Sequence, residues 1–458
     1  MQTFTPYKAL TRIHAIFAFA FIAVLSLCAC SNSEGVDYTN YAEIADDNDV
    51  SSDGDNPQTQ DASSSSKVID YLPLDDTEYP YAGIPRIVIE TENHREIKDR
   101  ETEIPAKLQI WGETAPESEI MELTIRGRGN SSWTDMPKKS YKIEFINKQE
   151  MLGMPKDRDW ALIANYADKT LMKNYLMYRL SAKLGLQSPR CRFVELYINK
   201  EYLGVYLLTE TIKIGKKRIN IPENGTFIAE IKENYRKGQQ MIYSHVLKTN
   251  SIGKPFRIHH PKNASTDDLQ AIQQRIENFE IFLTTIKPQK NNNIDKWINV
   301  NKYMAFYWIQ EFSKNLDADD YSSIFFFGKI DGPIEMGPVW DFDLSFGSSN
   351  YAKVNSPENW YIKTGYWHTQ LFRDTSIVNK QRTFWNENKN LFQSTFKSID
   401  SLQLSLNKAA SNNFRKWEIL QSTQYVYHRH SYNSYKDAVD DLKSWIQNRM
   451  KWIDRELQ

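Results

Sequence analysis

Short runs of alternating apolar and polar residues fill the first half of the chain beyond about residue 83. This two-residue period is typical of half-buried strands, which place successive side chains on opposite faces. The runs predict strands at Arg86–Glu90, Lys107–Gly112, Met121–Gly127, Ser140–Phe145, Arg192–Ile198, Val205–Thr209 and Thr226–Ile231. A helical pattern at Lys169–Leu184 interrupts the series.

After about residue 266 the spacing of the apolar residues becomes helical. It predicts helices at Thr266–Leu283 and Trp297–Phe312, and several more from about residue 380 to the end. Strands followed by helices favour an α+β fold over alternating α/β units. We therefore expect a two-lobed domain at 83–458, with a strand-rich lobe at about 83–235 and a helical lobe at about 265–458.

The N-terminal residues resemble an export signal. Lys8 and Arg12 precede an uncharged, largely apolar run at 15–27, which leads into the sequence Leu-Cys-Ala-Cys ending at Cys30. A basic start, a short apolar stretch and small residues before the cut are typical of a secretory signal peptide, here 1–29. The ending resembles a bacterial lipobox, which would make Cys30 the lipidated first residue. An ordinary signal peptide or a membrane anchor is the alternative.

Charge divides the rest of the chain. Residues 31–82 hold 13 acidic residues and one basic residue, whereas 83–458 hold 54 basic and 45 acidic residues. The acidic, Ser- and Asp-rich segment 30–82 has few large apolar side chains, so it is expected to be a disordered tether. The remaining thiol, Cys191, is interpreted as a buried small hydrophobe rather than a nucleophile.

The densest chemistry interrupts the helical half. An acidic loop at Asp317 precedes an apolar strand and a turn, and a second strand leads to Asp341 and Asp343. A hairpin would return the second acidic loop to the first, so the three carboxylates are expected to meet. Protein kinases use this logic, with one aspartate positioning the attacking hydroxyl and another holding Mg²⁺ on the phosphates. The alternative is that the aspartates form turns and cap helices.

Two metal-site interpretations fail on spacing. An EF-hand loop starting at Asp317 would place Ser322 where glycine is needed and Gly328 where glutamate is needed. His259 and His260 are adjacent, so on a strand they point to opposite faces. The basic run at 216–218 has no nucleic-acid motif beside it, and no nucleic-acid partner is expected.

Several motifs resemble the CotH kinase family, a group of atypical protein kinases related to spore coat protein H. They follow one another across about 86–455. They are Ile125-Arg-Gly-Arg-Gly-Asn-Ser-Ser-Trp133, Lys138-Lys-Ser-Tyr-Lys-Ile-Glu-Phe145, Gly204-Val-Tyr-Leu-Leu-Thr-Glu210, the loop Asn315-x-Asp317, Gly337-Pro-Val-Trp-Asp341-Phe-Asp343-Leu-Ser-Phe-Gly347 and Trp445-Ile-x-x-Arg449-x-x-Trp452.

The resemblance implies a kinase-like fold that uses ATP with Mg²⁺ or Mn²⁺ to phosphorylate protein Ser or Thr. It assigns Asp317 as the catalytic aspartate and Asp341 as a metal ligand, assisted by Asp343. Kinase loops of this type place asparagine five residues after the catalytic aspartate, as a ligand of the second metal. Here that position is Ser322, a weaker ligand.

The resemblance also implies a set of nucleotide contacts. Lys139 or Lys142 would contact the phosphates from the strand after the glycine-rich turn. Arg128 and Asn130 lie in that turn, whose backbone donors would face the phosphates. Glu210 would lie near the adenine or pair with a base of the first lobe. Glu230 is the alternative partner for that base.

Two functions remain open from the sequence. The first is a kinase of the bacterial cell envelope, lipid-anchored through Cys30 on the outer membrane, the cell surface or the periplasmic face, which phosphorylates an exported protein. The second is a non-catalytic surface lipoprotein that keeps the fold to bind a protein or glycan.

Overall fold

The computed structural model describes residues 71–458 except 249, 289, 291 and 426, and these residues belong to one compact unit, 68–458. The expected signal peptide (1–29), Cys30 and most of the expected tether lie outside the described residues. Within the described part, no helix combines the length and the apolar character needed to span a bilayer.

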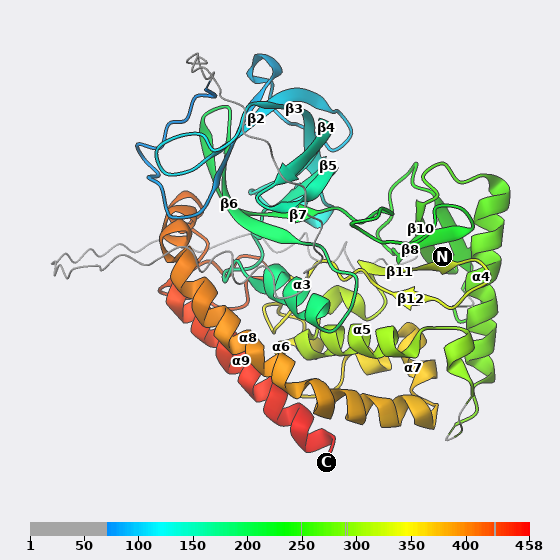
Figure 1. The fold of residues 1–458 in the computed structure, drawn as a ribbon. Helices are drawn as coiled ribbons and strands as arrows, with labels where there is room; N and C mark the ends of the chain where they lie inside the picture. The colour runs from blue at the N-terminus through cyan, green and yellow to red at the C-terminus, as the bar shows by residue number, and fades with distance from the viewer. Residues whose placement is uncertain (1–70, 249, 289, 291, 426) are drawn as a thin grey trace, which may run out of the picture. The chain divides into compact units, whose positions relative to one another are not determined.

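Seven strands close into a barrel in the order β1-β2-β3-β4-β5-β7-β6 (Figure 1). They are β1 (Arg86–Thr91), β2 (Ile104–Trp111), β3 (Met121–Arg128), β4 (Ser140–Met151), β5 (Met154–Ile163), β6 (Cys191–Ile198) and β7 (Glu201–Glu210). Neighbours pair antiparallel except β1 and β6, which close the barrel in parallel. Along β4, Ile143 and Phe145 face the barrel core, so Lys142 and Glu144 face outward.

A second sheet of five strands has the order β12-β11-β8-β10-β9. Its strands are β8 (Thr226–Ile231), β9 (Met241–Ser244), β10 (Lys254–His260), β11 (Ile324–Lys329) and β12 (Glu335–Met336). Its central contact is the antiparallel pairing of β8 with β11. The sheet therefore joins a strand of the strand-rich segment to a hairpin from the helix-rich segment, and the α+β prediction is confirmed.

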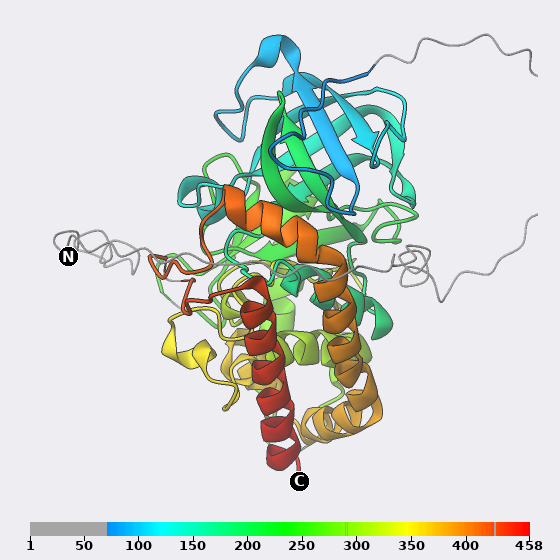
Figure 2. The same ribbon diagram turned by 90° about the vertical axis from the view of Figure 1, so that its left-hand side faces the viewer.

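Helices pack around these sheets. They are α2 (Ser131–Thr134), α3 (Lys173–Lys183), α4 (Thr266–Thr285), α5 (Val300–Ser313), α6 (Ala352–Asn355), α7 (Tyr366–Leu371), α8 (Thr375–Lys416) and α9 (Tyr435–Glu456), with 3-10 turns η2 (Glu92–His94), η3 (Ile294–Lys296), η4 (Leu316–Ala318) and η5 (Ile362–Thr364). Helix α8 contacts β7, α3, α5 and α9, and so ties the barrel to the helices (Figure 2).

Two helices begin later than the periodicity predicts, and a polar side chain accepts backbone N–H groups near the start of each. The Asp168 carboxylate accepts hydrogen bonds from the backbone N–H groups of Thr170 (2.8 Å) and Lys173 (2.9 Å), and α3 starts at Lys173. The Asn299 side chain accepts from the Lys302 N–H (3.2 Å), and α5 starts one residue after that asparagine. Both side chains satisfy N–H groups that have no partner inside the helix, and Asn299 does so as the N-cap residue.

Candidate active site

The β11–β12 hairpin brings the two acidic loops together, as the sequence predicts. Asn315 Nδ2 donates to the main-chain oxygen of Asp341 at 2.9 Å. Ser323, at the other end of the first loop, donates from its hydroxyl to Asp341 Oδ2 at 3.3 Å. The Asp317 carboxylate, on the 3-10 turn η4, lies between these two anchor points in the sequence and interacts electrostatically with Asp341.

Burial and the charge of Asp341 suppress the ionisation of Asp317 and Asp343. Burial, followed by repulsion from Asp341, raises the pKa of Asp317 to about 7, and Lys232 only partly opposes the shift. Burial also raises the pKa of Asp343 well above its ordinary value, with further contributions from the charge of Asp341 and a hydrogen bond to it. The loop therefore concentrates acidic groups where the described cations do not fully balance them.

Asp341 occupies an unusual backbone conformation. Its φ of +67° lies in the left-handed region, which residues other than glycine, asparagine and aspartate rarely adopt. The next N–H, of Phe342, donates to Asn174 Oδ1 of helix α3 at 2.7 Å. Together with Asn315, this contact holds the backbone on both sides of the Asp341 peptide group. Such local strain, held by surrounding hydrogen bonds, is common at functional sites.

Two cations approach the acidic loops from different sheets. Arg128, the last residue of β3, interacts with the charge of Asp341, and its guanidinium lies 5.1 Å from the centre of the Trp340 ring. Lys232, just beyond β8, places Nζ 3.0 Å from Glu230 Oε1. Burial opposes ionisation of Glu230, but Lys232 and His259 outweigh it and lower the pKa of Glu230 to about 2. Lys232 and Glu230 thus form a buried, charged pair beside Asp317.

The serines of the loop divide their contacts. Ser322, the expected metal ligand, has its hydroxyl 3.3 Å from the Ser323 hydroxyl and 3.5 Å from Lys232 Nζ. Ser323 reaches Asp341, and its backbone N–H donates to Glu230 Oε1 at 3.2 Å. The hydroxyl that contacts Asp341, in the second acidic loop, is therefore that of Ser323 and not that of Ser322.

Of the expected nucleotide contacts, the structure brings Arg128 to the acidic loops and gives the others different neighbours. Lys139 Nζ donates to the Trp133 main-chain oxygen. Lys142 pairs with Glu144 (2.8 Å) and Asp159 (3.1 Å) on the outside of the barrel. Asn130 precedes α2 and accepts the Trp133 N–H through its main-chain oxygen.

Glu210 and Cys191 also lie away from the acidic loops. Glu210 pairs with Arg190 at 2.8 Å and with Arg218 at 3.2 Å, both from the same strand-rich part of the chain. Cys191 is buried in β6, and burial raises the pKa of its thiol to about 12. A reactive thiolate therefore does not form there near neutral pH.

The donor set at the acidic loops fits a magnesium ion bound together with phosphates. Among the described residues, no three His, Cys, Asp or Glu side chains form a complete metal cage. Mg²⁺ at phosphate-transfer sites needs only one or two carboxylates, because substrate phosphates and water complete its shell. Asp341 and Asp343 lie close enough to share a hydrogen bond, and the buried Asn315 Oδ1 has no hydrogen-bond partner in the described part. These are hard oxygen ligands of the required kind.

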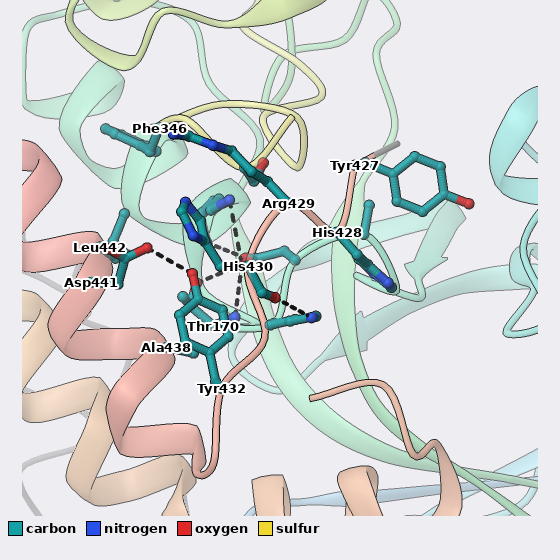
Figure 3. Close-up of a pocket in the computed structure, with 15 residues that line it drawn as sticks. Thr170, Phe346, Tyr427, His428, Arg429, His430, Tyr432, Ala438, Asp441 and Leu442 are labelled. Atoms are coloured by element: carbon teal, nitrogen blue, oxygen red, sulfur yellow. Dashed lines mark hydrogen bonds and ion pairs between the residues drawn. The ribbon is translucent and has the colours of Figure 1, made fainter. Parts of the chain in front are cut away.

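A small pocket lies next to this site, between the start of α3, the segment 427–432 and α9 (Figure 3). Tyr432 donates to Asp441 across it at 2.7 Å. Lys173 borders the pocket, donates to the Ser345 main-chain oxygen at 3.1 Å, and interacts with the charges of Asp441 and Asp343. None of Asp317, Asp341 and Asp343 lines the pocket.

Sequence reasoning missed Lys232 and Ser323. A signal for Lys232 was present, because Glu230 and Lys232 are two residues apart and side chains with that spacing share one face of a strand. The contact of Ser323 with Asp341 depends on how tightly the hairpin closes, which periodicity does not reveal. Nothing in the sequence distinguishes Ser323 from the expected ligand Ser322 beside it.

Taken together, an α+β fold presents three carboxylates on paired loops, faced by an arginine and a lysine from two sheets, as expected of a site that handles phosphate and a divalent cation. The family model described as CotH kinase protein matches residues 125–453, and the chain belongs to this family. It is also 22% identical over 343 residues to the inner spore coat protein H of Bacillus subtilis (strain 168). That match covers 74% of this chain and 88% of the relative.

Proposed function

We propose that this chain is a protein kinase that transfers the γ-phosphoryl group of ATP to serine or threonine of an exported protein. The observation that carries the proposal is that the β11–β12 hairpin brings Asp317, before β11, together with Asp341 and Asp343, after β12. Family membership supports the same reaction class. Arg128 and Lys232 add the positive charge that phosphate groups require at such a site.

Each side chain has a role that its surroundings favour. Asp317, whose pKa of about 7 is matched to neutral pH, accepts the proton of the attacking hydroxyl. Asp341 and Asp343 would hold the divalent cation, which would neutralise charge on the phosphates. Lys232 is held at the site by Glu230 and is proposed to contact the phosphates. Arg128 is oriented by the Trp340 ring.

The proposed transfer forms one bond to phosphorus, breaks another and moves one proton. The acceptor oxygen forms a bond to the γ-phosphorus while the bond from that phosphorus to the bridging oxygen breaks, and ADP leaves. The proton of the acceptor hydroxyl goes to the Asp317 carboxylate. Positioning and charge stabilisation account for most of the catalysis in this reaction class.

We further propose that the protein is a lipoprotein of the bacterial cell envelope, anchored through Cys30. The basic start, the apolar run and the Leu-Cys-Ala-Cys ending of the sequence support this proposal. Metabolic labelling of cells with a fatty-acid analogue tests it, since labelling of the chain is expected to disappear in Cys30→Ser. Labelling that persists in Cys30→Ser contradicts the assignment.

Phosphate transfer from labelled ATP tests the proposed activity, using the full-length chain in detergent with Mg²⁺ or Mn²⁺. Asp317→Ala and Asp341→Ala are expected to abolish transfer, whereas Asp331→Ala, an exposed residue of the hairpin turn, serves as the matched control. Absence of transfer together with absence of an ATP-induced rise in melting temperature contradicts the proposal.

ATP binding without transfer would instead support the non-catalytic alternative. The contact of Ser322 with Lys232 and Ser323 favours that alternative, because the structure gives this hydroxyl no contact with Asp341. Ser322→Asn separates the two functions, since it restores the residue type that kinases use for the second metal. Transfer that appears only in Ser322→Asn identifies the natural chain as a nucleotide-binding protein without turnover.

A further inference from the structure

Four arginines from separate segments lie together beside the acidic loops. They are Arg100 of the loop before β2, Arg126 of β3, Arg236 of the turn between β8 and β9, and Arg257 of β10. Arg126 Nη1 donates to the Arg100 main-chain oxygen at 2.7 Å. Arg257 lies opposite Glu230 in the β10–β8 ladder, which places the group next to the Lys232–Glu230 pair. These four residues are called the arginine cluster below.

The arginine cluster crosses from the barrel to the second sheet. Arg236 Nη1 lies 3.3 Å from Glu101 Oε1, and Glu101 follows Arg100 in the barrel loop. Burial, followed by the charges of Arg100, Arg257 and Arg126, lowers the pKa of Arg236, and Glu101 partly opposes the shift. The fold thus holds like charges near one another on two different substructures.

Counter-charge at the arginine cluster is sparse. Glu103 lies 3.4 Å from Arg126, and Glu101, whose side chain is 70% exposed, contacts Arg236. Arg100 donates to the Gly129 main-chain oxygen at 2.8 Å and forms no ion pair with another described residue. The charge of Glu230 attracts Arg257, but Glu230 is already paired with Lys232 and His259. Carbonyl oxygens orient a guanidinium without neutralising it, so the cluster keeps a net positive charge that an anionic partner would balance.

The charge exceeds what a nucleotide needs. A metal-bound triphosphate carries only a small net negative charge, and Arg128 and Lys232 already face the acidic loops to meet it. Four further guanidiniums on two substructures are better matched to an extended ligand with several carboxylates. Each guanidinium presents a planar fork of donors that suits carboxylate geometry.

We propose that the arginine cluster binds acidic residues flanking the acceptor serine or threonine, so that the preferred substrate is an acidic polypeptide segment. The inference rests on the proposed function, because the acidic segment is a substrate only if the protein is a kinase. Binding of the segment does not itself require phosphate transfer. Electrostatic recognition of this kind mainly sets association and partner choice, and it weakens with salt.

A fluorescent peptide with the sequence of residues 45–66 tests the binding, because it combines six aspartates with six serines. Anisotropy is measured with full-length Asp317→Asn protein, which removes turnover. The double variant Arg126→Glu/Arg236→Glu is expected to weaken binding by about tenfold or more. Arg382→Glu, an exposed charge reversal on α8, is the matched control and is expected to bind as the parent does.

A second pair of measurements keeps the test independent of folding defects. The milder Arg126→Gln/Arg236→Gln variant is expected to weaken binding less than charge reversal does. A control peptide with all six aspartates replaced by asparagine is expected to bind the parent at least about tenfold more weakly. Equal binding of the two peptides, or of the peptide to the parent and the charge-reversal variant, overturns the inference.

Nucleotide measurements separate this inference from the proposed function. The ATP-induced rise in melting temperature is expected to persist in the charge-reversal variant. If it is lost together with peptide binding, the arginines belong to the nucleotide site and the inference is overturned. If the parent binds the acidic peptide through these arginines but no transfer occurs, the proposed activity fails and the binding surface stands.

Discussion

Two clusters of charged side chains use the same residue types in opposite ways. On the outside of the barrel, Lys213 Nζ lies 2.6 Å from Asp157 Oδ1 and 2.7 Å from Asp159 Oδ2. Burial opposes ionisation there, yet the paired cations lower the pKa of Asp159 to about 2. At the acidic loops, burial and mutual repulsion instead raise the pKa values of Asp317 and Asp343.

The difference indicates what each cluster is for. A carboxylate paired with cations in the resting protein contributes to the fold and has little capacity left for a ligand. Buried carboxyls that repel one another reduce stability, and such arrangements concentrate at functional sites. The two clusters therefore make opposite predictions for removal of a single carboxylate charge.

The largest effect is expected for Asp341→Asn. Removal of the proposed metal ligand is expected to lower the transfer rate by about 10³-fold, since the charge on the phosphates loses its stabilisation. Stability is expected to rise, because Asp317 and Asp343 lose a repelling neighbour and asparagine tolerates the positive φ at this position. Initial rates and the midpoint of thermal unfolding measure the two effects. A variant that is both inactive and destabilised would show that Asp341 has a structural role.

The next effect concerns a buried ion pair with no proposed part in the reaction. Arg449 Nη2 of α9 lies 2.7 Å from Glu311 Oε1 of α5, and both side chains are fully buried. Arg449→Met leaves the Glu311 charge without its partner and is expected to cost about 3–5 kcal/mol in free energy of unfolding. Urea unfolding at pH 7 measures the loss. The double variant Glu311→Gln/Arg449→Met is expected to regain part of it, and equal loss in both variants would argue against an unpaired charge as the cause.

Sequence patterns predicted the parts of this molecule that depend on local spacing. The strands of the barrel that alternate cleanly, and the meeting of Asp317 with Asp341 through one hairpin, follow from neighbours close in the chain. Strand β5 was not predicted, because its polar first half masks the alternation. Strands β9 and β10 were also missed; they are edge and near-edge strands of a sheet whose core pairing, β8 with β11, joins segments far apart in the chain.

The difference between local spacing and long-range packing also explains which site residues could be predicted. Alternation along β4 separates Lys142 from the barrel core, but the pattern does not reveal which external neighbours it meets, here Glu144 and Asp159. The contacts of Lys232 and Arg128 with the acidic loops depend on the packing of two sheets against the hairpin. Long-range packing of this kind is outside what a single sequence reports through periodicity.

A pH series sharpens the comparison at the acidic loops. The pKa of Asp317 is raised from its ordinary 3.8 to about 7, so the folded protein binds a proton that the unfolded chain releases. This group's contribution to stability is therefore largest below about pH 4 and is lost as pH rises toward 7. The melting temperature of the parent minus that of Asp317→Asn is expected to decrease as the pH rises from 5 to 8. A constant difference across that range would contradict the raised pKa.

The smallest effect is expected at the cluster of Lys213, Asp157 and Asp159 on the outside of the barrel. Asp159→Asn removes a partner of Lys213 and Lys142 at a partly exposed position, so we expect a loss of about 1 kcal/mol or less at pH 7. Because the pKa of Asp159 is lowered from 3.8 to about 2, its contribution is present above pH 4 and fades as the pH falls toward 2. Urea unfolding of the parent and the variant at pH 7 and pH 3 measures this difference, which is expected to narrow at the lower pH. Peptide phosphorylation at pH 7 is expected to be unchanged. A large loss of transfer in Asp159→Asn would bring the barrel network into the reaction and remove the contrast between the two clusters.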